Sequence, residues 1–156
     1  MFERDQYEGA PYQLLLSVMG SQTPTSPHEL LSNDIWSLDT ECVEGPGSYV
    51  AIARRLQLLA KGDLPLVEIA DHFTDDAIWL TFRLAGKDYR WQAQVDEDWL
   101  DGQVLSAFGK LLVKQGSSRR FTYSNTGGQD CLIGCATPAE LSDLNALGGP
   151  RFVWLS

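Results

Sequence analysis

The feature of the sequence that most constrains the fold is a pair of strand-like segments joined by a tight turn. Residues 77–86 read AIWLTFRLAG, and the apolar residues on one side of their alternation are Ile78, Leu80, Phe82 and Leu84. A period of two places such residues on one face of a β-strand. The run 88–95 is also strand-like, and the intervening AGKD predicts a hairpin turn in which Gly86 takes a positive φ. With the preceding run 64–73, these segments predict an antiparallel meander.

Three further segments have features of helices. In YVAIARRLQLLAKG (49–62) apolar residues recur at helical intervals, and Ser48 is the predicted N-cap. The segment 99–116 repeats this spacing and ends at Gly116. Pro138 begins a short helix, PAELSDLNALGG, because proline is favoured in the first helical turn.

The remaining segments predict strands and loops. YQLLLSVMG (12–20) is interpreted as a buried strand, SQTPTSP (21–27) as a loop because two prolines interrupt it, and 28–39 is ambiguous. Residues 119–138 predict two strands joined by a glycine-rich turn. RFVWLS (151–156) predicts the last strand, which is either an exposed edge or buried in the sheet.

The order of these elements predicts an α+β fold, a mostly antiparallel sheet with about three helices packed on it. The chain has 156 residues, and a domain of this length buries roughly two thirds of its unfolded surface, enough for a core of its own. Hydrophobic residues make up 44% and charged residues 21%, a globular composition. We therefore expect a single domain over residues 1–156, with residues 1–11 as a loose N-terminal leader.

Charge and cysteine content limit the partners and the compartment. The 21 acidic and 12 basic residues give a net charge of -9, so neither nucleic acid nor an anionic membrane is an expected partner. The acidity is regional, since residues 63–101 hold ten acids and three bases, although solubility alone also explains it. No segment has the pattern of a signal peptide or a membrane span. Three cysteines are too few for a secreted disulfide framework, which favours a cytoplasmic protein.

The densest acidic stretch is WQAQVDEDWLDGQV (91–104), with four carboxylates around Trp99. The registers counted from its first acids do not match an EF-hand loop, which needs oxygen ligands at positions 1, 3 and 5, glycine at 6 and glutamate at 12. A glycosidase-like pair needs two carboxylates facing each other about 5 to 9 Å apart, whereas neighbours on one turn point apart. Asp71 or Asp75 could complete such a pair, and a cation would need ligands from elsewhere. No catalytic residue, metal site or cofactor is predicted.

A structural role accounts for part of this stretch. Asp98 or Asp101 is expected to cap the following helix, because a carboxylate accepts a free backbone N–H and an acid in the first turn is favoured by about 0.3 to 1 kcal/mol. Capping explains one or two of the acids. Those left without a structural role are Asp75, Asp76, Asp96 and Glu97.

Other reactive residues do not form a recognisable site. Cys131 and Cys135 lie four apart in a strand-like segment, roughly 13 Å, which rules out a shared zinc ion or a local disulfide. His28 and His72 are the only histidines, so a zinc site or a Cys–His nucleophile has few candidates. The sequence also lacks GxxxxGK[ST], GxGxxG and GxSxG, so nucleotide binding has no support.

The layout of residues 44–156 resembles a known group of proteins. The succession EGPGSY plus helix, YRWQAQVDEDWLDGQVL plus helix, TGGQDCLIGCATPAEL and a terminal FVWL is similar to small cytoplasmic immunity proteins of bacterial polymorphic toxin, contact-dependent and type VI secretion systems. The resemblance implies a protein that is not an enzyme and that binds a cognate toxin domain one to one, blocking its active site. It carries no fixed toxin-contact residues across to this chain.

The expected partner is therefore a toxin domain with a basic cleft. An acidic surface speeds association with such a cleft, and an aromatic anchor supplies affinity. The residues expected to bind it are Asp75, Asp76, Asp96, Glu97, Asp98 and Trp99, where Trp99 is either the anchor or a core residue. Two other functions stay open, a small enzyme that uses dispersed carboxylates and a scaffolding or regulatory module. The sequence does not indicate the oligomeric state.

Overall fold

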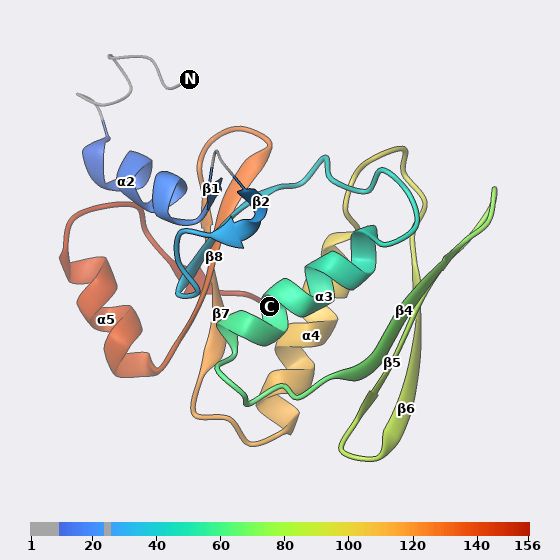
Figure 1. The fold of residues 1–156 in the computed structure, drawn as a ribbon. Coiled ribbons are helices and arrows are strands. Elements are labelled where there is room, and N and C mark those ends of the chain that lie inside the picture. The colour runs from blue at the N-terminus through green and yellow to red at the C-terminus, as the bar shows by residue number, and fades with distance from the viewer. Residues whose placement is uncertain (1–9, 24–25) are drawn as a thin grey trace. The chain divides into compact units, whose positions relative to one another are not determined.

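The computed structural model describes residues 10–23 and 26–156, which fall into two compact units (Figure 1). The terminal unit combines the chain up to Asp39 with Arg119–Leu155, and the central unit comprises Thr40–Ser118 together with Ser156. Of the leader predicted over residues 1–11, residues 1–9 lie outside the described part of the chain, Ala10 is the N-cap of a helix and Pro11 is its first residue. A single domain over the whole chain stays a prediction.

The terminal unit is built on a four-stranded antiparallel sheet with the strand order β3-β8-β7-β9. Its elements are α2 (Pro11–Met19), β1 (Gln22–Thr23), β2 (Ser26–Leu30), β3 (Ile35–Asp39), β7 (Arg120–Asn125), β8 (Asp130–Ala136), α5 (Pro138–Ala146) and β9 (Val153–Trp154). A core of Ile35, Leu132 and Phe152 receives Leu16 from α2 and Leu141 from α5. Both helices therefore turn their apolar sides to this core.

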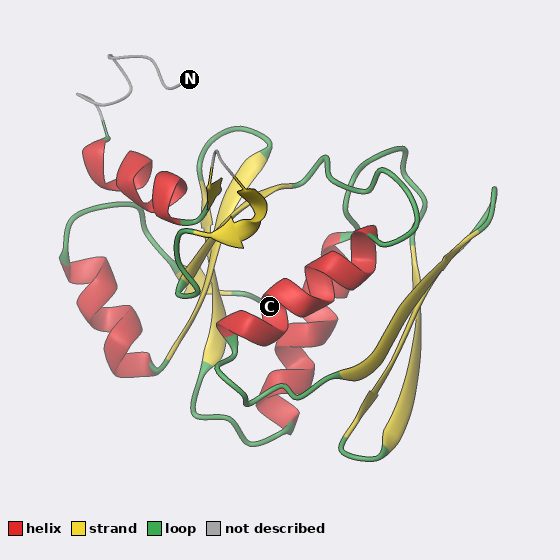
Figure 2. Cartoon of the chain, viewed as in Figure 1, coloured by secondary structure: helices red, strands yellow, loops and turns green. Residues whose placement is uncertain are grey.

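The central unit is a three-stranded antiparallel sheet in the order β4-β5-β6, with two helices beside it (Figure 2). Its elements are α3 (Ser48–Leu59), β4 (Val67–Phe73), β5 (Ile78–Leu84), β6 (Lys87–Ala93) and α4 (Gly102–Lys114). Alternate residues of β5, from Ile78 to Leu84, are buried. The Phe108 ring of α4 lies 5.4 Å from the Phe82 ring and 4.8 Å from the Trp91 ring, so α4 packs on this inner face.

The predicted hairpin is confirmed. β5 and β6 pair antiparallel along their whole length, from Ile78 opposite Ala93 to Leu84 opposite Lys87. Both turn residues take positive φ, 49° at Ala85 and 77° at Gly86. Two such residues give the turn the twist of the flanking strands, and glycine adopts this conformation without a steric penalty. β4 pairs with the other side of β5 and completes the predicted meander.

The segment 12–20 is a helix, so the predicted strand is wrong. Pro11 stands in the first turn, where its fixed φ suits a helix and its missing N–H would have no partner in the helix anyway. Leu14 is buried and Leu16 packs on the core. A short apolar run without alternation fits either period, and the packing against the terminal unit selects the helix. The described residues thus contain four α-helices rather than about three.

The predicted loop over 21–27 is also corrected. It contains β1 and the start of β2, which pair antiparallel, and residues 24–25 lie outside the described part of the chain. The ambiguous segment 28–39 holds the end of β2 and all of β3. The α+β class with antiparallel pairing is confirmed, but the strands form separate sheets rather than one, because each strand pairs with the partner that its own unit supplies.

The N-terminus of α3 is capped from a distant strand. Its N-cap is Gly47, with φ 96°, and not the predicted Ser48. Asp71 of β4 supplies the missing carboxylate: it accepts N–H bonds from Gly47 at 2.8 Å, Tyr49 at 3.0 Å and Val50 at 3.2 Å. The local prediction fails because a side chain 24 residues along the chain makes these bonds.

Candidate functional site

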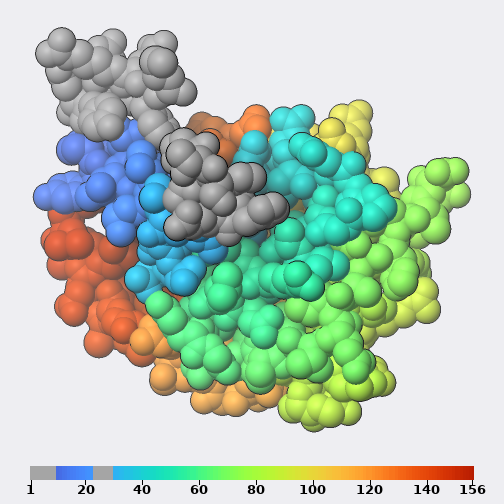
Figure 3. All heavy atoms as spheres, viewed as in Figure 1, coloured from blue at the N-terminus to red at the C-terminus, as the bar shows by residue number. Residues whose placement is uncertain are grey.

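Two of the predicted site residues lie at the turn between β4 and β5. The turn is closed by Thr74, whose backbone N–H donates to the Ala77 carbonyl at 2.9 Å and whose Oγ1 accepts the Ala77 N–H at 3.0 Å. These bonds leave Asp75 and Asp76 at the tip, and both are exposed. The tip of the hairpin projects from the surface, light green in the space-filling view (Figure 3).

The remaining predicted residues lie in the loop 94–101, whose base is fixed by Asp101. One carboxylate oxygen of Asp101 accepts the Gln103 N–H at 2.9 Å and caps α4, while the other accepts the Gln94 N–H at 2.9 Å. The backbone N–H of Asp101 donates to the buried Tyr49 hydroxyl at 3.1 Å. Of the two capping candidates, Asp101 is therefore the cap and Asp98 is not.

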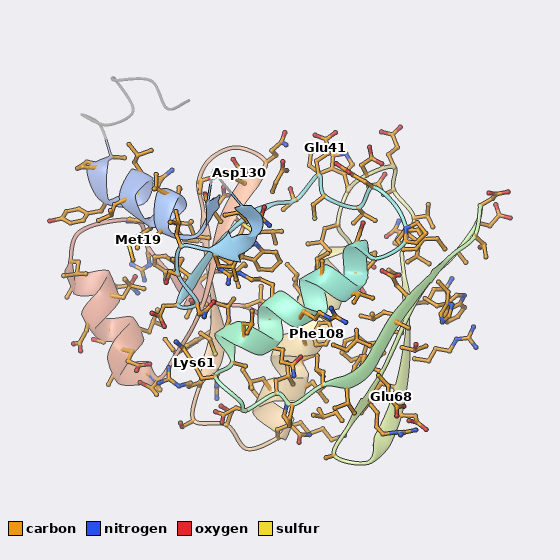
Figure 4. The ribbon with its side chains drawn as sticks, viewed as in Figure 1. Met19, Glu41, Lys61, Glu68, Phe108 and Asp130 are labelled. Atoms are coloured by element: carbon orange, nitrogen blue, oxygen red, sulfur yellow. The ribbon has the colours of Figure 1, made fainter. Side chains whose placement is uncertain are left out.

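A second strand-like segment holds the other side of this loop. The Val43 N–H donates to the Asp98 carbonyl at 2.9 Å, and the Leu100 N–H donates to the Thr40 carbonyl at 2.8 Å. Between these bonds, Glu41 pairs antiparallel with Trp99. Glu41 is exposed and is labelled in Figure 4. It adds an acid that no local pattern in the sequence connects with residues 96–98.

The loop has a defined internal conformation. The Trp99 N–H donates to the Asp96 carbonyl at 2.9 Å, and Glu97 takes a left-handed φ of 48°. Asp96, Glu97 and Asp98 are exposed. Trp99 is 37% exposed, so the interpretation of this residue as core is wrong, and its role as an anchor stays a prediction. The backbone of the loop is thus bonded at its base, at its side and within itself.

Sheet register brings the two groups of acids to the same end of the sheet. Phe73 of β4 stands opposite Ile78 of β5, and Ile78 stands opposite Ala93 of β6. The turn with Asp75 and Asp76 and the loop that follows β6 therefore both start from this end. We call Asp75, Asp76, Asp96, Glu97 and Asp98 the acidic end.

Of the two acids that could complete a catalytic pair, Asp71 is engaged in a helix cap and Asp75 is exposed. The described residues contain no group of three or more His, Cys, Asp or Glu side chains arranged to hold a metal ion. Cys131 and Cys135 lie on β8, as the strand interpretation requires, and Cys131 is buried. The His28 side chain lies outside the described part.

Sequence reasoning did not select the outer face of the same sheet as a candidate site. Because Ile78 and Leu80 face the core, Trp79 between them faces outwards, opposite His72 of β4 and Gln92 of β6. The Arg90 guanidinium lies 4.1 Å from the centre of the Trp79 ring. The alternation of β5 signals this outward row, but the Trp79–Arg90 contact depends on strand pairing.

A second arginine on this face is already paired. Arg83 donates from Nε to Asp88 at 2.8 Å and from Nη1 to Glu68 at 2.9 Å. The hydrogen bond to Asp88, with the charges of both carboxylates, raises the pKa of the Arg83 guanidinium. Figure 4 shows Glu68 toward the end of the sheet opposite the β4–β5 turn. The ion pairs thus lie away from the acidic end.

Comparison with known proteins does not place the chain in a family. No family model, no curated protein and no solved structure matches it. Among the helices of the described residues, none is long and apolar enough to cross a membrane.

Proposed function

We propose that this protein is a cytoplasmic immunity protein that binds a cognate toxin domain and blocks its basic active-site cleft without itself being an enzyme. The observation that supports the proposal is the acidic end, five exposed carboxylates on a turn and a loop that start from one end of a sheet. The hydrogen bonds within the loop hold its backbone before a partner arrives, which reduces the entropy lost on binding.

Charge supports a basic protein partner. The chain carries a net charge of -9, and its acidity is concentrated in residues 63–101, which contain the whole acidic end. Complementary charge raises association rates from about 10⁵–10⁶ M⁻¹s⁻¹ to as much as 10⁸–10⁹ M⁻¹s⁻¹ at low salt. Trp99, 37% exposed beside these acids, is the type of residue that most often supplies affinity at such interfaces.

The decisive experiment is a protection assay with charge-reversed variants. We expect the toxic domain to be the variable C-terminal domain of a secreted protein encoded immediately upstream. Its growth inhibition is measured with and without co-expression of the chain. Wild type is expected to restore growth. The double variant Asp96→Lys with Glu97→Lys is expected to lower the rate constant for association with the toxic domain about tenfold or more at low salt. The effect is expected to be smaller at moderate salt, because salt screens exposed charges.

A matched control reverses two acids outside the acidic end. Asp130→Lys with Asp143→Lys changes the net charge by the same amount on the terminal unit and is expected to leave specific protection intact. Equal slowing by both double variants would assign the effect to net charge alone. Turnover of a small substrate without any protein partner, or binding without protection, would replace immunity by the enzymatic or the scaffolding function.

A further inference from the structure

The outer face of β4, β5 and β6 continues the acidic end. We propose that Trp79 and Arg90 on this face form the anchor of the interface with the basic protein partner, an inference that rests on the proposed function. Trp79 is the second residue of β5, directly after the turn that carries Asp75 and Asp76. An anchor at this position adjoins a charged rim, which is the arrangement of a specific protein interface.

The chemistry of the pair suits an anchor. Tryptophan and arginine are enriched among the few residues that carry most of the binding energy at interfaces. The guanidinium of Arg90 stacks on Trp79 at 4.1 Å, and in the described part of the chain it makes no ion pair. Its N–H groups are therefore available to carbonyl or carboxylate oxygens of a partner, whereas those of Arg83 are engaged by Asp88 and Glu68.

The relief of this face fits a protein side chain better than a small molecule. A shallow depression of about 290 Å³ beside Arg90 is lined by Glu68, Thr81, Phe82, Asp88, Tyr89 and Arg90. Small-molecule sites usually enclose about 300 to 1,000 Å³ and bury most of the ligand. An open depression at the lower limit of that range accommodates a side chain presented by a partner surface.

The outer face is smaller than a typical protein interface. Three strands of seven residues cover roughly 14 by 23 Å, or about 330 Å², at the usual strand spacing and rise. A stable interface buries about 800 Å² on each partner. The outer face alone is therefore too small, and the interface must also include the adjacent turn and loop with their acids.

The negative charge of the acidic end favours a basic protein as the partner of this face. A second copy of the chain would bring another net charge of -9, and nucleic acid would bring phosphates, so both would be repelled at the acidic end. A basic protein surface is attracted there and still offers backbone carbonyl groups to Arg90. The partner that fits this face is thus the toxin domain of the proposed function.

The test compares two arginines in the same setting. Arg90→Glu is matched by Arg120→Glu, because Arg120 is also an exposed strand residue whose guanidinium lies over a tryptophan ring, 5.9 Å from Trp154 in the terminal unit. Both substitutions make the full chain equally more acidic. The dissociation constant for the toxic domain encoded beside the chain is measured at about 0.15 M salt, together with growth protection.

Arg90→Glu is expected to raise the dissociation constant at least about tenfold and Trp79→Ala at least about 30-fold, the effect of removing a dominant anchor. Arg120→Glu is expected to stay within about twofold of wild type. If circular dichroism shows that Trp79→Ala is unfolded, Arg90→Glu decides alone. Wild-type affinity in Arg90→Glu, or equal weakening by Arg120→Glu, overturns the anchor and leaves the proposed function standing. Failure of the wild-type chain to bind or protect overturns the proposed function and this inference together.

Discussion

Asp71 and Asp101 stabilise the central unit, because their carboxylates accept backbone hydrogen bonds. Asp71 accepts three backbone N–H groups at the start of α3. Asp101 accepts the N–H groups of Gln94 and Gln103, which join the end of β6 to the start of α4. A free N–H group at a helix start needs an acceptor, and a carboxylate is the strongest one that a side chain offers. Part of the regional acidity is therefore structural.

Replacing Asp71 by alanine is expected to lower the free energy of unfolding by about 1 to 2 kcal/mol, because three N–H groups of α3 lose their acceptor. The matched control is Asp75→Ala, an exposed acid of the adjacent turn, which is expected to stay within about 0.5 kcal/mol of wild type. Urea denaturation followed by circular dichroism measures both. Equal stability of the two variants would contradict the capping role.

Replacing Tyr49 by phenylalanine is expected to destabilise the chain by about 1 to 3 kcal/mol near neutral pH, because the buried hydroxyl accepts the Asp101 N–H. Burial raises the pKa of the Tyr49 phenol above its ordinary value of 10.0. The unfolded chain then loses this proton at a lower pH than the folded chain, so the contribution of Tyr49 is complete below pH 10 and decreases as the pH rises further. Denaturation curves above pH 10 should show that the difference in the free energy of unfolding between wild type and variant becomes smaller as the pH rises. A difference that does not change with pH would contradict the raised pKa of Tyr49.

At the scale of elements, the sequence predicted strands correctly where polar and apolar residues alternate, and it failed for a segment that has no such alternation. The strict alternation of β5 and the glycine turn at Gly86 specified the hairpin correctly. The run 12–20 lacks alternation, and its helix is selected by the core on which Leu16 packs. Gly20, at the end of this helix, lies close to β3. A Cβ on Gly20 would overlap the backbone of Trp36 and Ser37.

Replacing Gly20 by alanine is expected to destabilise the chain by about 1 to 3 kcal/mol, because the Cβ has no space against β3. Gly102→Ala is the control, since a Cβ there meets open space at the first residue of α4. It is expected to leave stability unchanged or to raise it by up to about 1 kcal/mol. Thermal and urea unfolding compare the two. If Gly102→Ala lost stability and Gly20→Ala did not, the close contact at Gly20 would be contradicted.

At the scale of the whole molecule, the two units differ in chain continuity. Apart from Ser156, the central unit is the continuous segment Thr40–Ser118, whereas the terminal unit is assembled from two distant segments. The central unit includes the aromatic cluster of Phe82, Trp91 and Phe108 and also the whole acidic end. The contacts of this core therefore lie within one continuous segment of the chain, which favours independent folding.

The fragment 40–118 is expected to fold by itself, with a cooperative unfolding transition and the near-ultraviolet dichroism of an ordered aromatic cluster. Its stability is expected to be below that of the whole chain, because a unit of this size buries a smaller share of its surface. The control is the same fragment with Phe108→Ala, which removes the ring shared by α4 and the sheet and should abolish that signal. A non-cooperative wild-type fragment would show that the two units fold only together.

The sequence by itself determined the α+β class, the β4–β5–β6 meander and three of the helices, because a period of two, a helical spacing and turn residues act over a few neighbouring positions. It also selected the acids of the turn and the loop, since a surplus of charge is visible in composition. Only the tertiary structure decided that α2 is a helix, that Asp71 caps α3 and that Trp99 is exposed. It likewise decided that Trp79 meets Arg90 beside the acidic end. These features depend on residues far apart in the chain, and packing and strand register, rather than local pattern, bring such residues together.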